Sequence, residues 1–492
     1  MSEPASPSES SDVFAERRAK LERLREAGIE PYPHAFPDRT EIAAVREAHE
    51  GIEAGEETGE RYRVAGRITA RREMGRTSFI DIRDGGGKLQ LQAKKDVLGE
   101  EAYQRLVGLD LGDILGAEGT VFATKRGELT LAVDAWELLA KSLRPPPEKF
   151  HGLEDVETRY RKRELDLMAN EETRQKFAAR ARTIAAVRRW LDARGFVEVE
   201  TPVLQPLYGG ALARPFTTHH NALDRDLYLR IATELYLKRL IVGGLDRVYE
   251  LGKDFRNEGL SHKHNPEFTM LEWYEAYADY EDTARELEAL VAAAAEDVLG
   301  TTKLERGGER IDLAPPWRRL TLREAISELT GIDIAEHPSR EALAEAMDSK
   351  PDPEEGWGKL VDGLLSKQVE PKVIQPTFIV DYPVELSPFA KRHRSVDGLV
   401  ERWEAFVGGI EIANSFTELN DPDEQRRRFE QQRAEADRGD EETQPYDEGF
   451  IEALEQGMPP TGGVGLGIDR LVMILTGAES LREVLLFPAM RS

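Results

Sequence analysis

The chain has 492 residues, 40% of them hydrophobic, which is enough material for two or three domains with well-filled cores. Its 93 acidic and 67 basic residues give a formal net charge of -26 at pH 7, so any contact with a polyanion such as RNA must use local basic patches. The chain has no cysteine, which excludes disulfides, thiolate metal sites and a cysteine nucleophile.

The first 58 residues are predicted to be a disordered tail followed by a helix. Residues 1–12 are rich in Ser, Pro and Glu, a composition typical of disorder. From Val13 to Ala27 apolar residues recur among charges at helical spacing, and Gly28 stops the pattern. The acidic start is unlike a secretory signal, and no apolar run approaches the length of a membrane span. We therefore expect a cytoplasmic protein with no membrane contact.

Residues 59–145 predict three short strands, a helix over 96–107 and two further strands. This order is typical of the five-stranded OB barrel, a fold that binds single-stranded nucleic acid by stacking bases on aromatic side chains. Phe79 could equally be part of the barrel core, and each of the other candidates could equally have no contact with nucleic acid. The candidate contact residues, on these strands or at their ends, are Arg67, Phe79, Gln90 and Glu128.

Three consecutive prolines at 145–147 oppose both helix and sheet pairing and mark a domain boundary. Residues 146–170 are predicted to be a charged linker, and residues 171–492 a second domain. That domain begins with a long helix, ending at Gly195, whose apolar residues share one face. The strand FVEVETPVL follows. On their own these elements are an ordinary amphipathic helix leading into a strand.

Two segments of the second domain predict antiparallel strands that share a polar face. Alternate residues of 251–258 and of 268–276 project to one side of each strand. A salt bridge could explain part of that face, but the whole row is too polar for a core without a ligand. The residues on this face are Arg256, Glu258, Phe268, Met270, Glu272 and Tyr274.

Gly408-Gly409 predicts a two-residue hairpin turn that brings Glu404 and Glu411 to the same face. Two carboxylates this close repel unless a cation lies between them, so the pair indicates either magnesium, an arginine neighbour or an exposed face. Glu418 lies an odd number of positions beyond Glu411. A bulge, or the end of the strand between 414 and 417, must therefore turn it back.

Near the C-terminus, GVGLGIDR at 463–470 combines glycines that allow close backbone approach with Asp469-Arg470 at the start of an apolar helix. Glycines spaced in this way are common in tight packing. Beside Arg256 and Phe268, however, the segment suggests a nucleotide held between those two residues and Arg470.

FRNEG at 255–259 with HNPEF at 264–268, and GVGLGIDR, resemble motifs 2 and 3 of class II aminoacyl-tRNA synthetases. The long helix, strand and Pro202 resemble motif 1, which forms much of the homodimer interface in that class. Over nearly the whole chain the sequence is similar to the bacterial-type lysyl-tRNA synthetases of subclass IIb. The longest similar runs include GGALARPFTTHHNALDRDLYLRIATELYLKRLIVGG and QPTFIVDYPVELSPFAKRH.

The resemblance implies an α+β protein. An N-terminal five-stranded OB β-barrel would read the anticodon, and residues 171–492 would form a class II synthetase catalytic domain with an antiparallel sheet flanked by helices. It also implies a homodimer that uses L-lysine, ATP with Mg2+, and tRNA(Lys). The reaction would pass through lysyl-adenylate, with no residue acting as nucleophile or obligatory general base.

Site residues follow from the resemblance, position by position. Arg256 and Arg470 would be the catalytic residues, with adenine stacked between Phe268 and Arg470. Glu418 would serve both lysine and metal. The lysine site would comprise Gly210, Glu234, Arg256, Glu272, Tyr274, Asn414 and Glu418. The ATP site would comprise Arg256, Glu258, His264, Asn265, Phe268, Glu411, Gly467 and Arg470. The metal ligands would be Glu404, Glu411 and Glu418.

The acidic set agrees with independent chemistry, because a desolvated ammonium group requires acceptors and each charge-assisted hydrogen bond contributes roughly 1.5 to 3 kcal/mol. An aspartyl or asparaginyl enzyme would need a cation at that depth. A lysyl transferase acting on a protein, or a catalytically silent RNA-binding paralogue, is a further alternative. Thr233 stands where a proline is common in the family, and Trp273 replaces the usual aliphatic residue. The segment 336–369 has no assigned function.

Overall fold

The computed structural model describes residues 7–147, 153–349, 356–436 and 444–491, and the chain divides into two compact units, Met1–Asn170 and Glu171–Ser492. Each unit is described by itself. Among the described helices, none is long and apolar enough to cross a lipid bilayer.

The first unit begins with helix α1 (Pro7–Glu26). The prediction of disorder through residue 12 is therefore wrong for residues 7–12, and residues 1–6 lie outside the described residues. The physical reason is that the helix begins at Pro7, and proline is favoured at the first helical position because its fixed φ suits the helix and its missing N–H would have no partner there. The predicted linker is also partly helical, with α5 (Val156–Arg161) and α6 (Arg163–Ala169).

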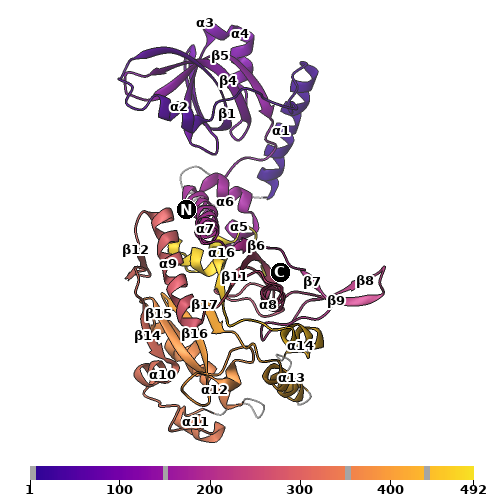
Figure 1. The fold of residues 1–492 in the computed structure, drawn as a ribbon. Coiled ribbons are helices and arrows are strands. Elements are labelled where there is room, and N and C mark those ends of the chain that lie inside the picture. The colour runs from indigo at the N-terminus through magenta and orange to yellow at the C-terminus, as the bar shows by residue number, and fades with distance from the viewer. Residues whose placement is uncertain (1–6, 148–152, 350–355, 437–443, 492) are drawn as a thin grey trace. The chain divides into compact units, whose positions relative to one another are not determined.

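Five strands form a closed barrel in the order β1-β2-β3-β5-β4 (Figure 1). Two short helices, α3 (Lys95–Leu98) and α4 (Glu100–Val107), connect β3 to β4, so the predicted order of three strands, helix and two strands is confirmed. Alternate residues such as Ile80, Ile82, Leu89 and Leu91 fill the interior. Helix α2 (Ile42–Ala48) adds Ile42 and Val45 to the same core. The strands are β1 (Glu57–Met74), β2 (Thr77–Arg83), β3 (Lys88–Lys94), β4 (Ile114–Ala123) and β5 (Leu129–Ala140).

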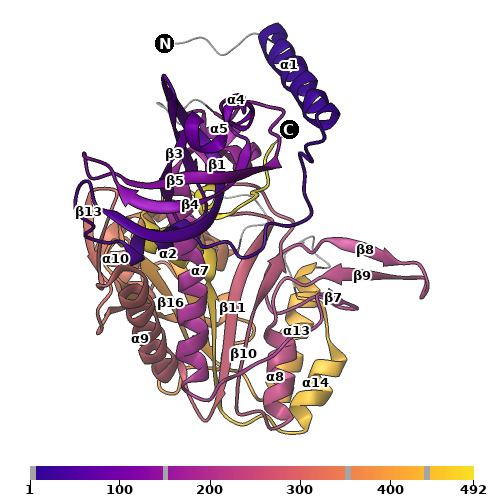
Figure 2. The ribbon, with the colours of Figure 1, turned by 90° about the horizontal axis from the view of Figure 1, so that it is seen from above.

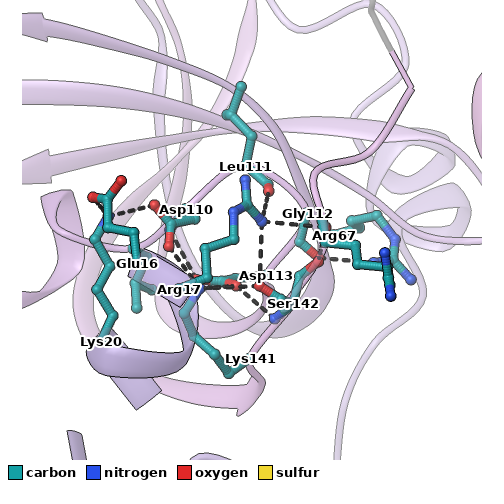
Figure 3. A network of polar contacts seen from close by, with 12 residues as sticks. Glu16, Arg17, Lys20, Arg67, Asp110, Leu111, Gly112, Asp113, Lys141 and Ser142 are labelled. Atoms are coloured by element: carbon teal, nitrogen blue, oxygen red, sulfur yellow. Dashed lines mark hydrogen bonds and ion pairs between the residues drawn. The ribbon is translucent and has the colours of Figure 1, made fainter. Parts of the chain in front are cut away.

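A buried polar network joins α1 to the loop before β4 (Figure 3). Lys141, whose side chain is 1% exposed, places Nζ 2.7 Å from Asp110 Oδ2 and 2.8 Å from Asp113 Oδ1. Asp110 also accepts from Lys20 of α1, at 2.6 Å. Arg17 donates to main-chain carbonyls on both sides of the network. The N-terminal helix is thus held to the barrel by specific charge pairs.

The second unit is built on an eight-stranded sheet in the order β14-β15-β16-β17-β18-β11-β10-β6 (Figure 1). Neighbouring strands are antiparallel except at the two edges, where β14 and β6 each run parallel to their neighbour. The strands are β6 (Val197–Glu198), β10 (Arg247–Phe255), β11 (Glu267–Ala276), β14 (Arg318–Thr321), β15 (Thr377–Pro383), β16 (Leu399–Val407), β17 (Ile410–Thr417) and β18 (Thr461–Gly467).

One face of this sheet is covered by α7 (Glu171–Asp192) and α9 (Tyr280–Leu299) (Figure 2). Helix α15 (Ile468–Thr476) packs in the same core. Trp273 and Trp403 project from the sheet into this core. Trp273 Nε1 donates to Glu286 of α9 at 3.0 Å, which leaves the alternate residues Glu272 and Tyr274 on the opposite face. That face, left open by these helices, carries the functional side chains.

Helices α8 (Glu234–Val242), α13 (Pro422–Ala436) and α14 (Glu448–Glu455) border the open face and share a smaller apolar cluster with Tyr274 and Phe389. A third cluster packs β15 against apolar residues of the 336–369 segment, among them Leu343 and Leu360. The elements outside the main sheet are β7 (Leu204–Gln205), β8 (Thr217–His220), β9 (Arg225–Leu229), β12 (Lys303–Arg306), β13 (Glu309–Asp312), α10 (Leu322–Thr330), α11 (Arg340–Ala346), α12 (Trp357–Leu364) and α16 (Leu481–Val484).

Candidate active site

A cavity of about 300 Å³ lies on the open face of the sheet. Strands β11, β17 and β18 form its floor, and the segment after β10, the start of α8 and the start of α15 form its walls. It collects nearly all the predicted residues of the second domain: Gly210, Glu234, Arg256, Glu258, His264, Asn265, Phe268, Glu272, Tyr274, Glu411, Asn414, Glu418, Gly467 and Arg470.

The antiparallel pairing of β10 with β11 is confirmed, with Asp254 opposite Phe268. Strand β10 ends at Phe255, so Arg256 and Glu258 lie in the loop that follows rather than on the predicted strand through residue 258. The main chain leaves the ladder here, because Arg256 N donates to Pro266 while the next amide bonds to another segment. Arg256 Cζ lies 5.1 Å from the centre of the Phe268 ring.

One end of the cavity is strongly acidic. Tyr274 donates its hydroxyl to Glu272 Oε2 at 3.1 Å, and Oε1 of the same carboxylate accepts from the amide of Thr233 at 3.1 Å. Burial, reinforced by Asp254 and Glu234, raises the pKa of Glu272 to about 8. This end of the cavity can accept cationic groups, which would relieve the repulsion between its carboxylates.

Burial also raises the pKa of Glu418 to about 8, against the opposing effect of Lys238. Lys238 lies fully buried on α8, with Nζ 2.5 Å from Glu234 Oε1 and in an ion pair with Glu418 Oε2. This lysine was not among the site residues expected from the sequence. The spacing of Glu234 and Lys238, four residues apart on a largely apolar helix, could have indicated the pair.

A glycine turn closes the same end of the cavity. Gly210 has φ +89°, and a Cβ there would meet Glu234 Cβ at 2.9 Å, so both conformation and space require glycine. Its amide donates to Gln444 Oε1 at 3.1 Å, and Gln444 donates back to the carbonyl of Ala211. Gln444 was also missed, because nothing in its local sequence marks a contact 234 residues away.

The other end of the cavity carries positive charge and an aromatic ring. Arg470 donates from Nη1 to Glu411 Oε2 at 2.9 Å and to the carbonyl of the same residue at 2.8 Å. Burial, with Arg470 and Lys263 nearby, lowers the pKa of His264 to about 4, so this imidazole is neutral at pH 7. Asn265 is held by its main-chain neighbours, donating to Glu267 O at 2.5 Å and accepting from Ala489 N at 3.2 Å.

The hairpin at Gly408-Gly409 is confirmed with the predicted register, but the bulge lies earlier than expected. Glu411 pairs with Phe406 and Ala413 with Ala405, so Ile412 is the extra residue. The expected position, between 414 and 417, is wrong. One extra residue exchanges the two faces, so Glu411 shares its side with Asn414 and Glu418, all three lining the cavity.

The three predicted metal ligands fall into two groups. Glu404 accepts from Tyr382 at 3.0 Å and pairs with Arg402, and burial raises its pKa to about 7. Burial would raise the pKa of Glu411 too, but Arg470, Arg402 and Arg256 together outweigh it and the pKa is lowered. Glu418 instead interacts with Lys238 and the acidic end. Within the described ranges, no three acidic or histidine side chains lie close enough together to hold a metal.

The described part of the chain therefore does not contain the predicted cluster of three carboxylates. Glu418 is kept apart from the other two because it pairs with Lys238. Glu411 lines the cavity, whereas Glu404, which lies opposite Asn414 on the neighbouring strand, is not among the described lining residues. Both supply carboxylate oxygens, the donors that a hard cation takes. Magnesium typically uses one or two protein carboxylates together with substrate phosphates and water. A two-carboxylate arrangement is therefore compatible with it.

Arg402 is a further residue that sequence analysis missed. Its Nε donates to Asn414 Oδ1 at 3.2 Å, and its Nη2 pairs with Glu404. The guanidinium also lies 4.4 Å from the centre of the Tyr382 ring. Arg402 therefore connects a residue assigned to lysine with one assigned to the metal.

The candidate residues of the barrel occupy different environments. Phe79 is half-buried and lies outside the interior apolar cluster, opposite Gln92 of β3. Gln90 is buried and accepts from Thr130 at 3.2 Å, while Glu128 is exposed. Arg67 donates to the carbonyl of Gly112 at 2.7 Å (Figure 3). Phe79 is thus the side chain of this group most available for stacking.

Comparison with known proteins agrees with this geometry. Residues 155–491 match the family model of tRNA synthetases class II (D, K and N), and residues 62–139 match that of the OB-fold nucleic acid binding domain. Fold and site together define a class II aminoacyl-tRNA synthetase, and the predicted α+β architecture is confirmed.

Within that class, the similar proteins are lysine–tRNA ligases. The chain is 53% identical over 485 residues to the lysine–tRNA ligase of Moorella thermoacetica, covering 98% of each chain. It is 52% identical over 488 residues to the lysine–tRNA ligase of Roseiflexus castenholzii, covering 98% of this chain and 99% of the relative. With Synechococcus sp. (strain CC9311), the identity is 50% over 485 residues. The chain belongs to the lysine–tRNA ligase family.

Proposed function

We propose that this protein uses ATP to activate L-lysine as lysyl-adenylate and then transfers the lysyl group to tRNA(Lys) in the cytoplasm, where charged tRNA is consumed. The observation that carries the proposal is a single cavity with buried carboxylates at one end and Arg256, Phe268 and Arg470 towards the other. Membership of the lysine–tRNA ligase family supports the choice of amino acid.

The acidic end would bind the substrate through its two ammonium groups. The ε-ammonium would donate to Glu272, Tyr274 and Glu418, and the α-ammonium to Glu234 and the main chain at Gly210. Asn414, held by Arg402, would complete the wall beside the aliphatic chain. Charge-assisted hydrogen bonds of about 1.5 to 3 kcal/mol each offset the loss of hydration of both ammonium groups.

The other end would bind ATP. Adenine would stack between Phe268 and Arg470, replacing the present contact between Phe268 and Arg256. Arg256 would then be free to bridge the lysine carboxylate and the α-phosphate. A neutral His264 can both donate to and accept from the nucleotide. Glu258, Asn265 and Gly467 would supply the remaining contacts.

Glu404 and Glu411 are proposed to hold Mg2+ together with the triphosphate. The bound cation would supply neutralisation of the phosphate charges. The protein's own contribution is the position of these carboxylates. Arg402 holds Glu404 and Arg470 holds Glu411, so each carboxylate is oriented before the ligand arrives.

In the activation step the lysine carboxylate attacks the α-phosphorus in line, forming a carboxyl–phosphate bond as the bond to pyrophosphate breaks. The terminal adenosine hydroxyl of tRNA then attacks the lysyl carbonyl, and AMP leaves. Charge develops on the phosphate oxygens, so Arg256 and Arg470 contribute by fixed positive charge and by alignment of the reactants. The cavity residues bind and orient, and none acts as a covalent nucleophile.

The barrel would bind the anticodon with Phe79 as a stacking platform, assisted by Arg67, Gln90 and Glu128. We also propose a homodimer. Apolar side chains around the motif 1 segment are unusually exposed, among them Val197 at 49%, Val203 at 40% and Leu204 at 47%. A second copy covering them would remove this surface from water.

Amino-acid-dependent exchange of pyrophosphate into ATP tests the function. Lysine should support exchange, and aspartate and asparagine should not. Exchange with either of the latter, or none with lysine, would contradict the proposal. Arg256→Ala should lower the exchange rate about 10³-fold, the scale for removing one arginine that stabilises a phosphoryl transition state. The exposed Arg285, paired with Asp282 on the surface, provides a matched control as Arg285→Ala.

A further inference from the structure

The amino-acid end of the cavity contains a lysine of the protein itself. Lys238 is completely buried, and its ammonium group lies between Glu234 and Glu418, with the Phe389 ring 5.1 Å away. Among the described residues that line the cavity, Lys238 is absent while both of its carboxylate partners are present. The ammonium group therefore lies behind the carboxylates and acts on the cavity through them.

Each of these carboxylates gives one oxygen to Lys238 and keeps the other for the cavity. Glu234 uses Oε1 for the lysine, and its Oε2 lies against Gly210, 3.7 Å from the position of a Cβ on that glycine. Glu418 uses Oε2 for its ion pair with Lys238, and its Oε1 lies over Gly463, a glycine that lines the cavity; both oxygens are buried, and neither has a hydrogen-bond partner within the described part of the chain. The two free oxygens are thus directed by a single buried cation.

The charges at this end follow from the same arrangement. Glu234, Glu272 and Glu418 carry three negative charges when ionised, and Lys238 neutralises one. Of the charged groups behind Glu272, Asp254 and Glu250 share the single guanidinium of Arg230, and the second positive charge that acts on Asp254 is that of Arg256. Two negative charges remain at the cavity wall, which equals the number of ammonium groups on free lysine. Buried ions are costly unless they are paired, so an equal count favours a ligand with two cations.

We propose that Lys238 is a positioning residue that makes this site specific for a substrate with two ammonium groups. It directs one oxygen of Glu234 and one of Glu418 into the cavity and reduces the negative charge there from three to two. This inference rests on the proposed function and adds to it the residue that sets the charge and direction of the lysine acceptors.

The test compares neutral and charged replacements of Lys238 by pyrophosphate exchange, with KM measured separately for lysine and ATP. Lys238→Met and Lys238→Gln should raise the KM for lysine at least 10-fold and leave the KM for ATP within 2-fold. Lys238→Arg keeps the cation and should recover most of the lysine affinity. A folded neutral variant with an unchanged lysine KM overturns the proposal, as does one in which both KM values rise together.

Lys176 provides a matched control. It also bridges two glutamates, Glu172 at 2.9 Å and Glu483 at 2.7 Å, but lies outside the cavity. Lys176→Met should leave the lysine KM unchanged, and an equal rise in this variant would show that loss of any lysine that bridges two glutamates has the same effect.

If neither neutral variant folds, ligand binding to the unmodified protein gives the answer. The compound 1,5-diaminopentane retains both ammonium groups of lysine and lacks the carboxylate, whereas norleucine lacks the ε-ammonium. Diaminopentane should compete with lysine more strongly than norleucine does, and the reverse order overturns the proposal. Failure of the proposed function gives a different result, because the unmodified protein would then show no lysine-dependent exchange.

Discussion

Oε1 of Glu418 lies directly over the α-carbon of Gly463, in the space where any larger residue would place its side chain. The ring of Tyr274 borders the same space. Strand β18 therefore passes beneath Glu418 and Tyr274, the two side chains next to Gly463 that are assigned to the ε-ammonium, and has no side chain of its own at this position. Gly463 has an ordinary backbone conformation, and the requirement for glycine is therefore one of space alone.

A methyl group at Gly463 should selectively damage lysine recognition. Gly463→Ala would displace Glu418 and Tyr274, and we expect at least a 10-fold rise in the KM for lysine in pyrophosphate exchange, with the KM for ATP changed less than 2-fold. Gly465→Ala is the control, because a Cβ there meets Met270 Sδ at 3.8 Å and Glu272 Cγ at 3.9 Å, which are ordinary contacts. Equal effects of the two substitutions would refute this account.

Lysine binding should release protons at neutral pH. The pKa of Glu272 is raised to about 8 in the empty cavity, so the carboxyl is largely protonated at pH 7, and an arriving ammonium favours the ionised form. Affinity for lysine should therefore increase from pH 6.5 to about pH 8 and then level off. Calorimetry at pH 7 in two buffers of different ionisation enthalpy measures the protons released.

Glu272→Gln supplies the comparison for that measurement, because it removes this titrating group. The variant should bind lysine more weakly and release fewer protons at pH 7. The remainder is expected from Glu418, whose pKa is also raised to about 8. If proton release is the same in both proteins, Glu272 is already ionised in the empty cavity and the prediction is wrong.

The network around Lys141 should stabilise the first unit. Lys141→Met would leave Asp113, which is fully buried, without its cation, and loss of one partner of a buried ion pair costs about 3 to 5 kcal/mol. Denaturation of the full chain should show an earlier transition for this variant, while lysine-dependent exchange stays normal. The exposed Lys125, replaced by Met, should change neither. An unchanged denaturation midpoint would show that the network does not stabilise the first unit.

Phe79 should contribute to tRNA binding and not to activation. Loss of one base-stacking aromatic costs about 1 to 3 kcal/mol, so Phe79→Ala should raise the KM for tRNA(Lys) roughly 5- to 150-fold and leave pyrophosphate exchange unchanged. Val97→Ala is the control, because it also truncates an apolar side chain of the barrel unit, at an exposed position on α3. If aminoacylation by Phe79→Ala matches that of the control, Phe79 has only a structural role.

Periodicity in the sequence was sufficient for the local features of the site. Alternation along β11 predicted that Phe268, Glu272 and Tyr274 share a face and that Trp273 points away, because side chains of a strand alternate by geometry alone. Gly408-Gly409 likewise predicted the register of its hairpin. Such features depend on neighbours close in sequence.

The sequence by itself determined the family, the barrel followed by a sheet domain, and many of the side chains that line the cavity, though not Arg402 or Gln444. Only the tertiary structure decided which charged side chains pair with one another and how they are oriented. The partnership of Lys238 with Glu418 and the contact of Gln444 with Gly210 join segments far apart in the chain, whereas the bulge at Ile412 lies within the β16–β17 hairpin, in a strand that also pairs with the distant β18. Local propensity specifies strands and helices, whereas burial and charge pairing depend on which distant segments the completed fold brings together.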